Sequence, residues 1–151
     1  MKVCLGGTFY PLHEGHKELL RKAFQIAGPN GTVFIGLTSQ SMIKKEGKIA
    51  SYQRRKHSLM RFLSELHGLK QATIQPIRTK YGPTIEGDFE AIIVSPETES
   101  TAEEINRKRR VLGKAPLQII MIPYILSKDG TPISSTRIRR KEIDEKGTIL
   151  E

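Results

Sequence analysis

Two histidines, His13 and His16, lie three residues apart in a glycine-rich segment that follows a short apolar run. At this spacing the rings fall on the same side of a helix that begins here. Such imidazoles can donate hydrogen bonds to phosphate oxygens while charge builds during a transfer reaction. Gly15 between them leaves room for an incoming phosphate, and Gly6 and Gly7 let the backbone turn close to a ligand. The spacing predicts a phosphate-transfer site.

Taken by itself, the histidine pair has a second interpretation. Histidines near a helix start are more often solvated surface or an ordinary cap than a catalytic pair. The glycine-rich turn is also ambiguous, because dinucleotide-binding proteins have one too. However, the chain contains neither Gly-x-Gly-x-x-Gly nor Gly-x-x-x-x-Gly-Lys-[Ser/Thr], which excludes two common phosphate-binding patterns.

A second candidate phosphate-binding segment follows an expected turn at Asp129-Gly130 and reads Ile-Ser-Ser-Thr-Arg-Ile-Arg over residues 133–139. Ser134, Ser135 and Thr136 would expose hydroxyl and backbone donors together at a helix start. Arg137 behind them could grip a phosphate group. The alternative is an ordinary Ser/Thr helix cap followed by basic surface.

Strands and helices that could position these segments alternate along the chain. Apolar runs predict strands over residues 2–5, 32–37, 72–77, 89–94 and 117–122. Helical spacing predicts helices over 16–27, 51–66 and 101–112, with a last helix over 134–141 and a loop or loose helix over 39–50. This order predicts an α/β fold: a Rossmann-like doubly wound sheet of about five parallel strands with helices on both faces. Both candidate segments fall at carboxyl ends of strands, where such sheets bind ligands.

Composition narrows the class of protein. The chain has 151 residues, of which 37% are apolar and 27% charged, so we expect residues 1–151 to form a single folded domain. No apolar run is long enough to span a bilayer, and Cys4 has no partner for a disulfide. We therefore expect a cytoplasmic protein.

The net charge of +9 should attract polyanions, either nucleic acid or small phosphorylated ligands. A nucleic-acid-binding module that uses the cluster Arg107–Arg110 is thus an alternative from a different class. Two observations argue against it: the chain has no RNA-recognition signature, and its 6% aromatic content offers few residues for base stacking.

Together, the Gly-Gly-Thr-Phe-x-x-Leu-His-x-Gly-His opening and the Ile-Ser-Ser-Thr-x-x-Arg segment resemble the HxGH nucleotidyltransferase superfamily. The middle of the chain, from Ser95-Pro96-Glu97-Thr98 through Asn106 to Pro116-Leu117, is similar to the archaeal and eukaryotic-type pantetheine-phosphate adenylyltransferases. The resemblance runs from about residue 3 to about residue 147. One departure is Tyr10, which stands where many members of the superfamily have Asp.

The resemblance implies transfer of the AMP part of ATP to 4′-phosphopantetheine, giving dephospho-coenzyme A and pyrophosphate by direct in-line attack. It also implies that Mg²⁺ accompanies ATP without being held by protein side chains. Because site details set substrate choice, FMN, nicotinamide mononucleotide or glycerol 3-phosphate could instead be the acceptor.

The resemblance further assigns roles to individual residues. His13 and His16 would stabilise the transition state, and Thr8 would also position the attacking phosphate. The predicted contacts with ATP are Gly6, Thr8, Phe9, Arg109, Ser134, Ser135, Thr136 and Arg137. The acceptor phosphate is assigned to Lys44, with Lys45 and Lys48 as alternatives. No role is predicted for Tyr52, Arg54 or Arg55.

Overall fold

A computed structural model describes residues 1–43, 49–134, 137–138 and 141–150. Among these residues lies a five-stranded sheet whose paired strands are all parallel, in the order β3-β2-β1-β4-β5. The strands are β1 (Lys2–Gly7), β2 (Thr32–Thr38), β3 (Ala72–Ile77), β4 (Ala91–Val94) and β5 (Gln118–Met121). The predicted doubly wound α/β fold is confirmed.

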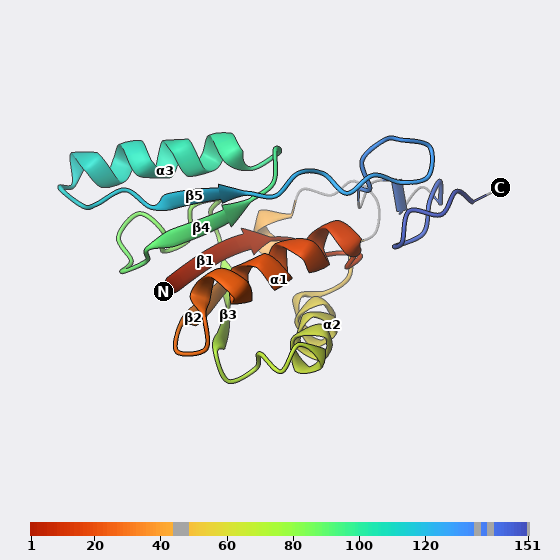
Figure 1. The fold of residues 1–151 in the computed structure, drawn as a ribbon, viewed down its shortest axis with the longest axis horizontal. Helices are drawn as coiled ribbons and strands as arrows, with labels where there is room; N and C mark the ends of the chain where they lie inside the picture. The colour runs from red at the N-terminus through yellow and green to blue at the C-terminus, as the bar shows by residue number, and fades with distance from the viewer. Residues whose placement is uncertain (44–48, 135–136, 139–140, 151) are drawn as a thin grey trace.

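Helices of the described chain cover both faces of the sheet (Figure 1). They are α1 (Glu14–Ala27), α2 (Tyr52–Glu65) and α3 (Glu99–Val111), with a short 3-10 helix, η1 (Gln40–Met42). On one face, Leu20 of α1 and Leu59 of α2 join a buried core with Ile35. On the other, Ile105 of α3 packs with Ile92. Because both faces are buried, the strands are nearly continuous apolar runs.

The boundaries of the main elements lie within two residues of the predicted ones. β1 is longer than predicted, because Gly6 and Gly7 still pair with β2. Of the predicted helix over residues 134–141, the structure describes helical backbone at 137–138, while 135–136 and 139–140 lie outside the described residues. No helix of the described chain is both long and apolar enough to cross a membrane.

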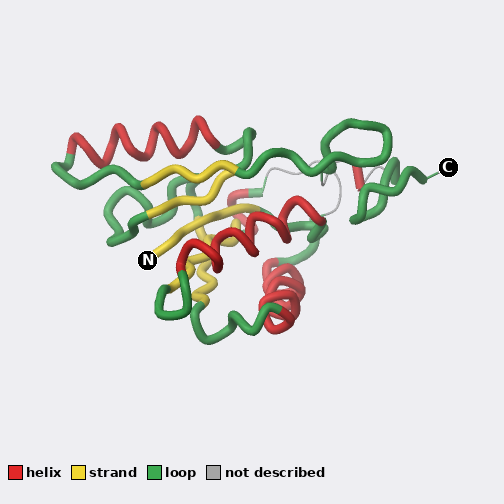
Figure 2. The backbone as a smooth tube through the Cα atoms, viewed as in Figure 1, coloured by secondary structure: helices red, strands yellow, loops and turns green. Residues whose placement is uncertain are grey.

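The strand order reverses between β1 and β4, which are neighbours in the sheet although β2 and β3 lie between them in sequence. The described residues of the range 122–150, here called the C-terminal segment, lie beyond the carboxyl ends of the strands (Figure 1). Most of the described part of this segment is loop (Figure 2). It contacts the start of α1, where the Glu14 N–H donates to the Glu145 carbonyl at 3.1 Å. The reversal point, the start of α1 and the C-terminal segment therefore share one edge of the sheet.

Candidate active site

A cavity of about 620 Å³ lies at this carboxyl edge. Its lining joins residues 6–16, which we call the β1–α1 corner, to the C-terminal segment. The predicted site residues that line it are Gly6, Thr8, Phe9, His13, His16 and Ser134. Within the described lining, Glu97 is the one residue with a carboxylate, and none is Lys or Arg. The described wall thus offers neutral donors to a ligand.

His13 is the N-cap of α1. Its backbone is extended, and its Nδ1 accepts hydrogen bonds from the backbone N–H groups of Gly15 at 3.0 Å and His16 at 3.4 Å. In return, Nδ1 of His16 accepts from the His13 N–H at 3.2 Å. The two rings stack with their centroids 3.7 Å apart. The pair forms a reciprocal capping box, a role more often filled by Ser or Thr with Glu or Gln.

These contacts fix the position of the proton on each ring. A nitrogen that accepts from an N–H group carries no hydrogen, so each neutral ring carries its hydrogen on Nε2. Burial lowers the pKa of His13 to about 4. Burial, together with the neighbouring His13, lowers the pKa of His16 to about 3, against an opposing hydrogen bond with the backbone of Pro11. Both rings are therefore neutral at pH 7, and no described residue accepts a hydrogen bond from Nε2 of His13.

Gly15 has a more specific role than the one predicted from the sequence. A Cβ atom at this position would lie 2.8 Å from Cε1 and 3.0 Å from Nδ1 of His13. A real Cβ does not approach so closely, so any side chain here would displace the His13 ring. The glycine makes room for the capping histidine itself.

The backbone before the histidines turns sharply at Phe9, whose φ of 49° lies in the left-handed region that is uncommon for a non-glycine residue. The Phe9 side chain is only 2% exposed and its ring lies 5.1 Å from that of His16. Gly6 faces the cavity, and a Cβ there would lie 3.2 Å from the Gly36 carbonyl oxygen of β2. The turn thus buries the Phe9 side chain and leaves the backbone at Gly6 accessible to a ligand.

A buried arginine lies beneath the corner. Arg55 of α2 is 1% exposed, and its Nη1 donates to the Thr8 carbonyl at 3.3 Å and to Thr38 Oγ1 at 3.2 Å. Its Nε donates to the Ala50 carbonyl at 2.9 Å, and its Nη2 donates to Gln40 Oε1 at 3.0 Å. The Thr38 hydroxyl in turn donates to Thr8 Oγ1 at 3.1 Å. Burial lowers the pKa of Arg55. The usual pKa of an arginine is so high that the side chain nevertheless stays charged.

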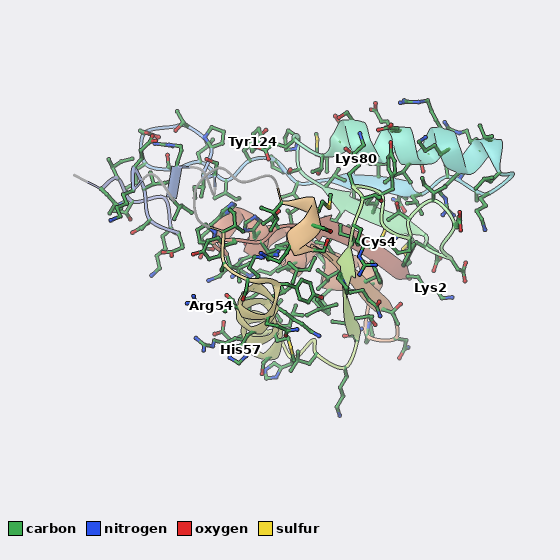
Figure 3. The ribbon with its side chains drawn as sticks, turned by 180° about the vertical axis from the view of Figure 1, so that it is seen from behind. Lys2, Cys4, Arg54, His57, Lys80 and Tyr124 are labelled. Carbon is green, nitrogen blue, oxygen red and sulfur yellow. The ribbon has the colours of Figure 1, made fainter. Side chains whose placement is uncertain are left out.

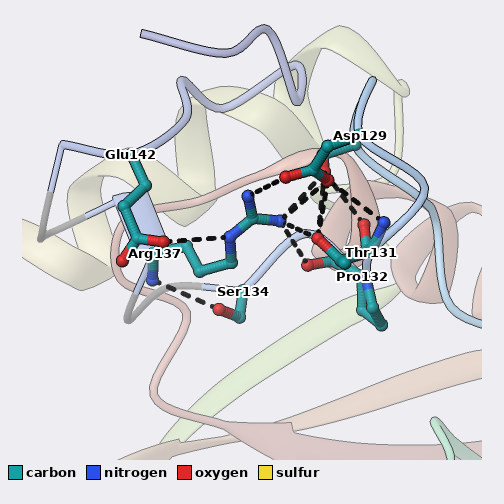
Figure 4. Close-up of polar contacts among 7 residues, drawn as sticks. Asp129, Thr131, Pro132, Ser134, Arg137 and Glu142 are labelled. Carbon is teal, nitrogen blue, oxygen red and sulfur yellow. Dashed lines mark hydrogen bonds and ion pairs between the residues drawn. The ribbon is translucent and has the colours of Figure 1, made fainter. Parts of the chain in front are cut away.

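The C-terminal segment brings Ser134 to the cavity but uses Arg137 differently from the prediction. The Arg137 Nη2 donates to Asp129 Oδ2 at 2.5 Å (Figure 4). Its Nη1 donates to Ser127 Oγ at 2.9 Å. Its Nε lies 3.5 Å from Glu142 Oε1. Hydrogen bonding to Arg137 holds the pKa of Asp129 well below its usual range. Arg137 braces the predicted turn at Asp129-Gly130, and it is absent from the described cavity lining.

Arg109, which was predicted to reach the triphosphate, does not line the cavity. Arg109 is 5% exposed near the end of α3, and its Nη1 donates to the carbonyls of Thr84 at 2.8 Å and Gly87 at 2.9 Å. These carbonyls precede β4, so Arg109 lies at the amino edge of the sheet, opposite the cavity. Asn106 also has a structural role, because its amide side chain donates to the Leu117 carbonyl and accepts from the Leu117 N–H. Both residues of the Asn-x-x-Arg spacing therefore bind backbone groups of the protein.

Several predicted basic and hydroxyl residues fall in the two gaps 44–48 and 135–136 of the described chain. Lys44, Lys45, Lys48, Ser135 and Thr136 lie outside the described residues. So does Arg139, on which the arginine of the Ile-Ser-Ser-Thr-x-x-Arg pattern falls when it is counted from Ile133. The family arginine is therefore better assigned to Arg139 than to Arg137.

The sequence did not point to Thr38, which lines the cavity, or to Arg55, which is buried and contacts Thr38. Arg55 stands four and seven positions before Leu59 and Phe62, which places it on the buried stripe of α2. An arginine on such a stripe needs polar partners, and this signal could have been read from the sequence. Thr38 ends β2 at the carboxyl edge and was one residue beyond the predicted strand.

Comparisons with known proteins agree with this geometry. The family model described as Cytidylyltransferase-like matches residues 4–141. A phosphopantetheine adenylyltransferase of Methanosarcina acetivorans is 48% identical over 98% of this chain and 95% of its own, and one of Archaeoglobus fulgidus is 42% identical over 99% and 100%.

A solved structure of an Archaeoglobus fulgidus protein of unknown function is 39% identical, with a TM-score of 0.71, and covers 81% of this chain and 89% of its own. The model match covers most of the chain, and the two named relatives extend over nearly its full length. The chain belongs to the cytidylyltransferase-like family and, within it, to the phosphopantetheine adenylyltransferases.

Proposed function

We propose that this chain transfers the AMP part of ATP to 4′-phosphopantetheine and releases pyrophosphate, forming dephospho-coenzyme A. A phosphate oxygen of the acceptor attacks the α-phosphorus of ATP, and the bond from that phosphorus to the bridging oxygen of pyrophosphate breaks. A phosphate monoester is an adequate nucleophile, so the protein mainly positions two anions and stabilises developing charge. No covalent enzyme intermediate is required.

The observation that carries this proposal is the cavity at the strand-order reversal, which brings Thr8, His13 and Ser134 together. Open α/β sheets bind nucleotides at this point, and the start of α1 favours anions through its dipole. Relatives of nearly the same length as this chain carry the same named activity. The neutral Nε2–H donor of His13 suits a triphosphate whose charge shifts toward the leaving group.

The two sides of the cavity suit two different substrates. Near Thr38, the apolar side chains of Met42, Ile43 and Ile49 fit the alkyl and amide chain of the acceptor. The other side, which includes Ile122, Ile125 and Ser134, would take the nucleotide. His13 and His16 of the corner would then lie near the reacting phosphates.

We further propose that Mg²⁺ enters with the triphosphate. Among the described residues no group of three or more His, Cys, Asp or Glu side chains could hold a metal ion. The ion would neutralise part of the triphosphate charge, and the protein would contribute hydrogen-bond donors alone. Omitting Mg²⁺ should therefore weaken turnover without changing the thermal stability of the nucleotide-free protein.

The proposal is tested by measuring pyrophosphate release from Mg-ATP with each candidate acceptor in turn. The expected result is turnover with 4′-phosphopantetheine, with dephospho-coenzyme A identified as the product. Turnover with FMN, nicotinamide mononucleotide or glycerol 3-phosphate in its place would overturn the choice of acceptor. Salt-sensitive RNA binding without turnover on any acceptor would overturn the enzyme class itself.

A further inference from the structure

We propose that Arg55 and Thr38 are positioning residues that aim the hydroxyl hydrogen of Thr8 into the cavity, toward the phosphate of the acceptor. This inference rests on the proposed function and adds to it a hydrogen-bond relay of three side chains. Two of these side chains were assigned no role from the sequence.

The direction of the relay is set at its buried end. A guanidinium has only donors, so Thr38 Oγ1 must accept the hydrogen bond from Arg55 Nη1 at 3.2 Å. A threonine hydroxyl has one hydrogen, and that of Thr38 is donated to Thr8 Oγ1 at 3.1 Å. The single hydrogen of the Thr38 hydroxyl is thereby committed to the corner, while its oxygen accepts from α2.

The same reasoning leaves the hydrogen of Thr8 available. Its oxygen accepts from Thr38, and within the described chain no acceptor takes the Thr8 hydroxyl hydrogen. Thr8 and Thr38 both line the cavity, so an acceptor phosphate that enters beside them meets a donor already oriented. Each hydrogen bond in such a chain also polarises the next, which strengthens the last donor.

Arg55 also holds the backbone and side chains next to the relay in place. Its Nη1 holds the Thr8 carbonyl, while Nη2 and Nε hold Gln40 and Ala50, which flank the segment between β2 and α2. The guanidinium therefore ties the β1–α1 corner to this neighbouring wall of the cavity. A donor held in this way loses little conformational freedom when the phosphate binds.

Thr38→Val and Thr38→Ser form a matched pair that tests the relay. Valine keeps the shape of threonine and removes the hydroxyl, whereas serine keeps the hydroxyl. We expect Thr38→Val to raise the KM for 4′-phosphopantetheine about tenfold, the effect of one lost hydrogen bond to a charged group. The KM for ATP should stay within about twofold, and Thr38→Ser should restore the acceptor KM to near the wild-type value.

Arg55→Lys and Arg55→Met test the buried end of the relay. Lysine keeps a charged donor but cannot hold all four partners, so its acceptor KM should lie between those of the wild type and Arg55→Met. The matched control is Arg54→Met, because Arg54 is the adjacent exposed arginine on the outer side of α2 (Figure 3). This control should leave both KM values unchanged.

The outcomes separate the relay from the proposed function. If the wild-type protein does not turn over 4′-phosphopantetheine, the proposed function fails before any variant is compared. If the wild type is active and Thr38→Val leaves the acceptor KM unchanged, the relay is overturned. Equal rises in both KM values, or loss only of thermal stability, would show a purely structural role and would also overturn it. Should Arg55→Met fail to fold, the Thr38 pair decides alone.

Discussion

The β1–α1 corner and the C-terminal segment both carry a phosphate-type motif, yet they differ in whether protein groups accept hydrogen bonds from their side-chain donors. In the corner, Nδ1 of His13 caps its own helix, and no described residue accepts from Nε2. In the C-terminal segment, Arg137 gives every one of its nitrogens to protein acceptors such as Asp129 and Glu142. The comparison indicates that a polar side chain in either segment serves a ligand only with the donors that other protein groups leave unused.

The largest effect should come from removing the spare donor while keeping the cap. His13→Asn retains an oxygen that accepts from the N–H groups of Gly15 and His16, so the melting temperature should change by only a few degrees. It lacks the Nε2–H donor, so kcat should fall about 100-fold or more. Steady-state kinetics and thermal melting measure the two effects, with the exposed His57→Asn on α2 as control (Figure 3).

Near-normal turnover by His13→Asn would show that the ring serves only as a cap. In that case the catalytic donor would have to be His16 or a residue outside the described chain. The His16→Ala variant then becomes decisive, because it should also lose about 100-fold in turnover if the pair acts on the triphosphate.

A smaller effect is expected from Gly15→Ala. Alanine favours a helix over glycine by about 1 kcal/mol, so propensity alone predicts a more stable protein. The Cβ would instead push the His13 ring aside, since it would lie 2.8 Å from Cε1. We expect kcat to fall about tenfold with a melting temperature close to the wild-type value. An active and more stable Gly15→Ala protein would contradict the tight packing of the corner.

Substitutions in the C-terminal segment should change the kinetics less than those in the corner. If Arg137 only braces this segment, Asp129→Asn and Arg137→Met should each raise the KM for ATP by about fivefold or less, because exposed ion pairs contribute little. Asparagine suits the turn as aspartate does. The double variant should be no worse than either single one, because both remove the same contact. A rise of about 100-fold for Arg137→Met alone would instead place Arg137 on the nucleotide.

The smallest expected effect is on the pH dependence of the free energy of unfolding, and it is absent at neutral pH. Burial lowers the pKa of His13 to about 4 and that of His16 to about 3, so below pH 6.5 the unfolded chain takes up protons that the folded chain does not. The free energy of unfolding should therefore fall as pH drops from 6.5 toward 4, by about 1 kcal/mol per pH unit for each histidine. Denaturant titrations of the wild type and His13→Asn measure it, and identical slopes would contradict these pKa values.

Much of the fold could be predicted from the sequence because its signals are local. Apolar runs such as residues 32–37 mark buried strands, and helix ends follow caps and glycines. The strand order, by contrast, depends on the pairing of β4 with β1, which brings Val3 beside Ala91 and which no local pattern specifies. The single-domain organisation and the cytoplasmic location remain predictions.

The candidate site was only partly predictable for the same reason. The spacing of His13 and His16 identifies the corner, but it does not show that their Nδ1 atoms cap the helix. Arg109 and Arg137 carry the expected charge, and only the tertiary structure shows that carbonyls and carboxylates of the protein already occupy them. The burial of Arg55 was visible as a helical stripe, whereas its contacts with Thr8 and Thr38 were not.

The most direct test of the central claim is a nitrogen-detected NMR measurement of the histidine side chains at pH 7. The account predicts that His13 and His16 are both neutral with their hydrogen on Nε2. Adding Mg-ATP should shift the Nε2 resonance of His13 while its Nδ1 remains an acceptor from the α1 backbone. A hydrogen on Nδ1 of His13, a charged ring at pH 7, or an Nε2 signal that ignores ATP would contradict the account.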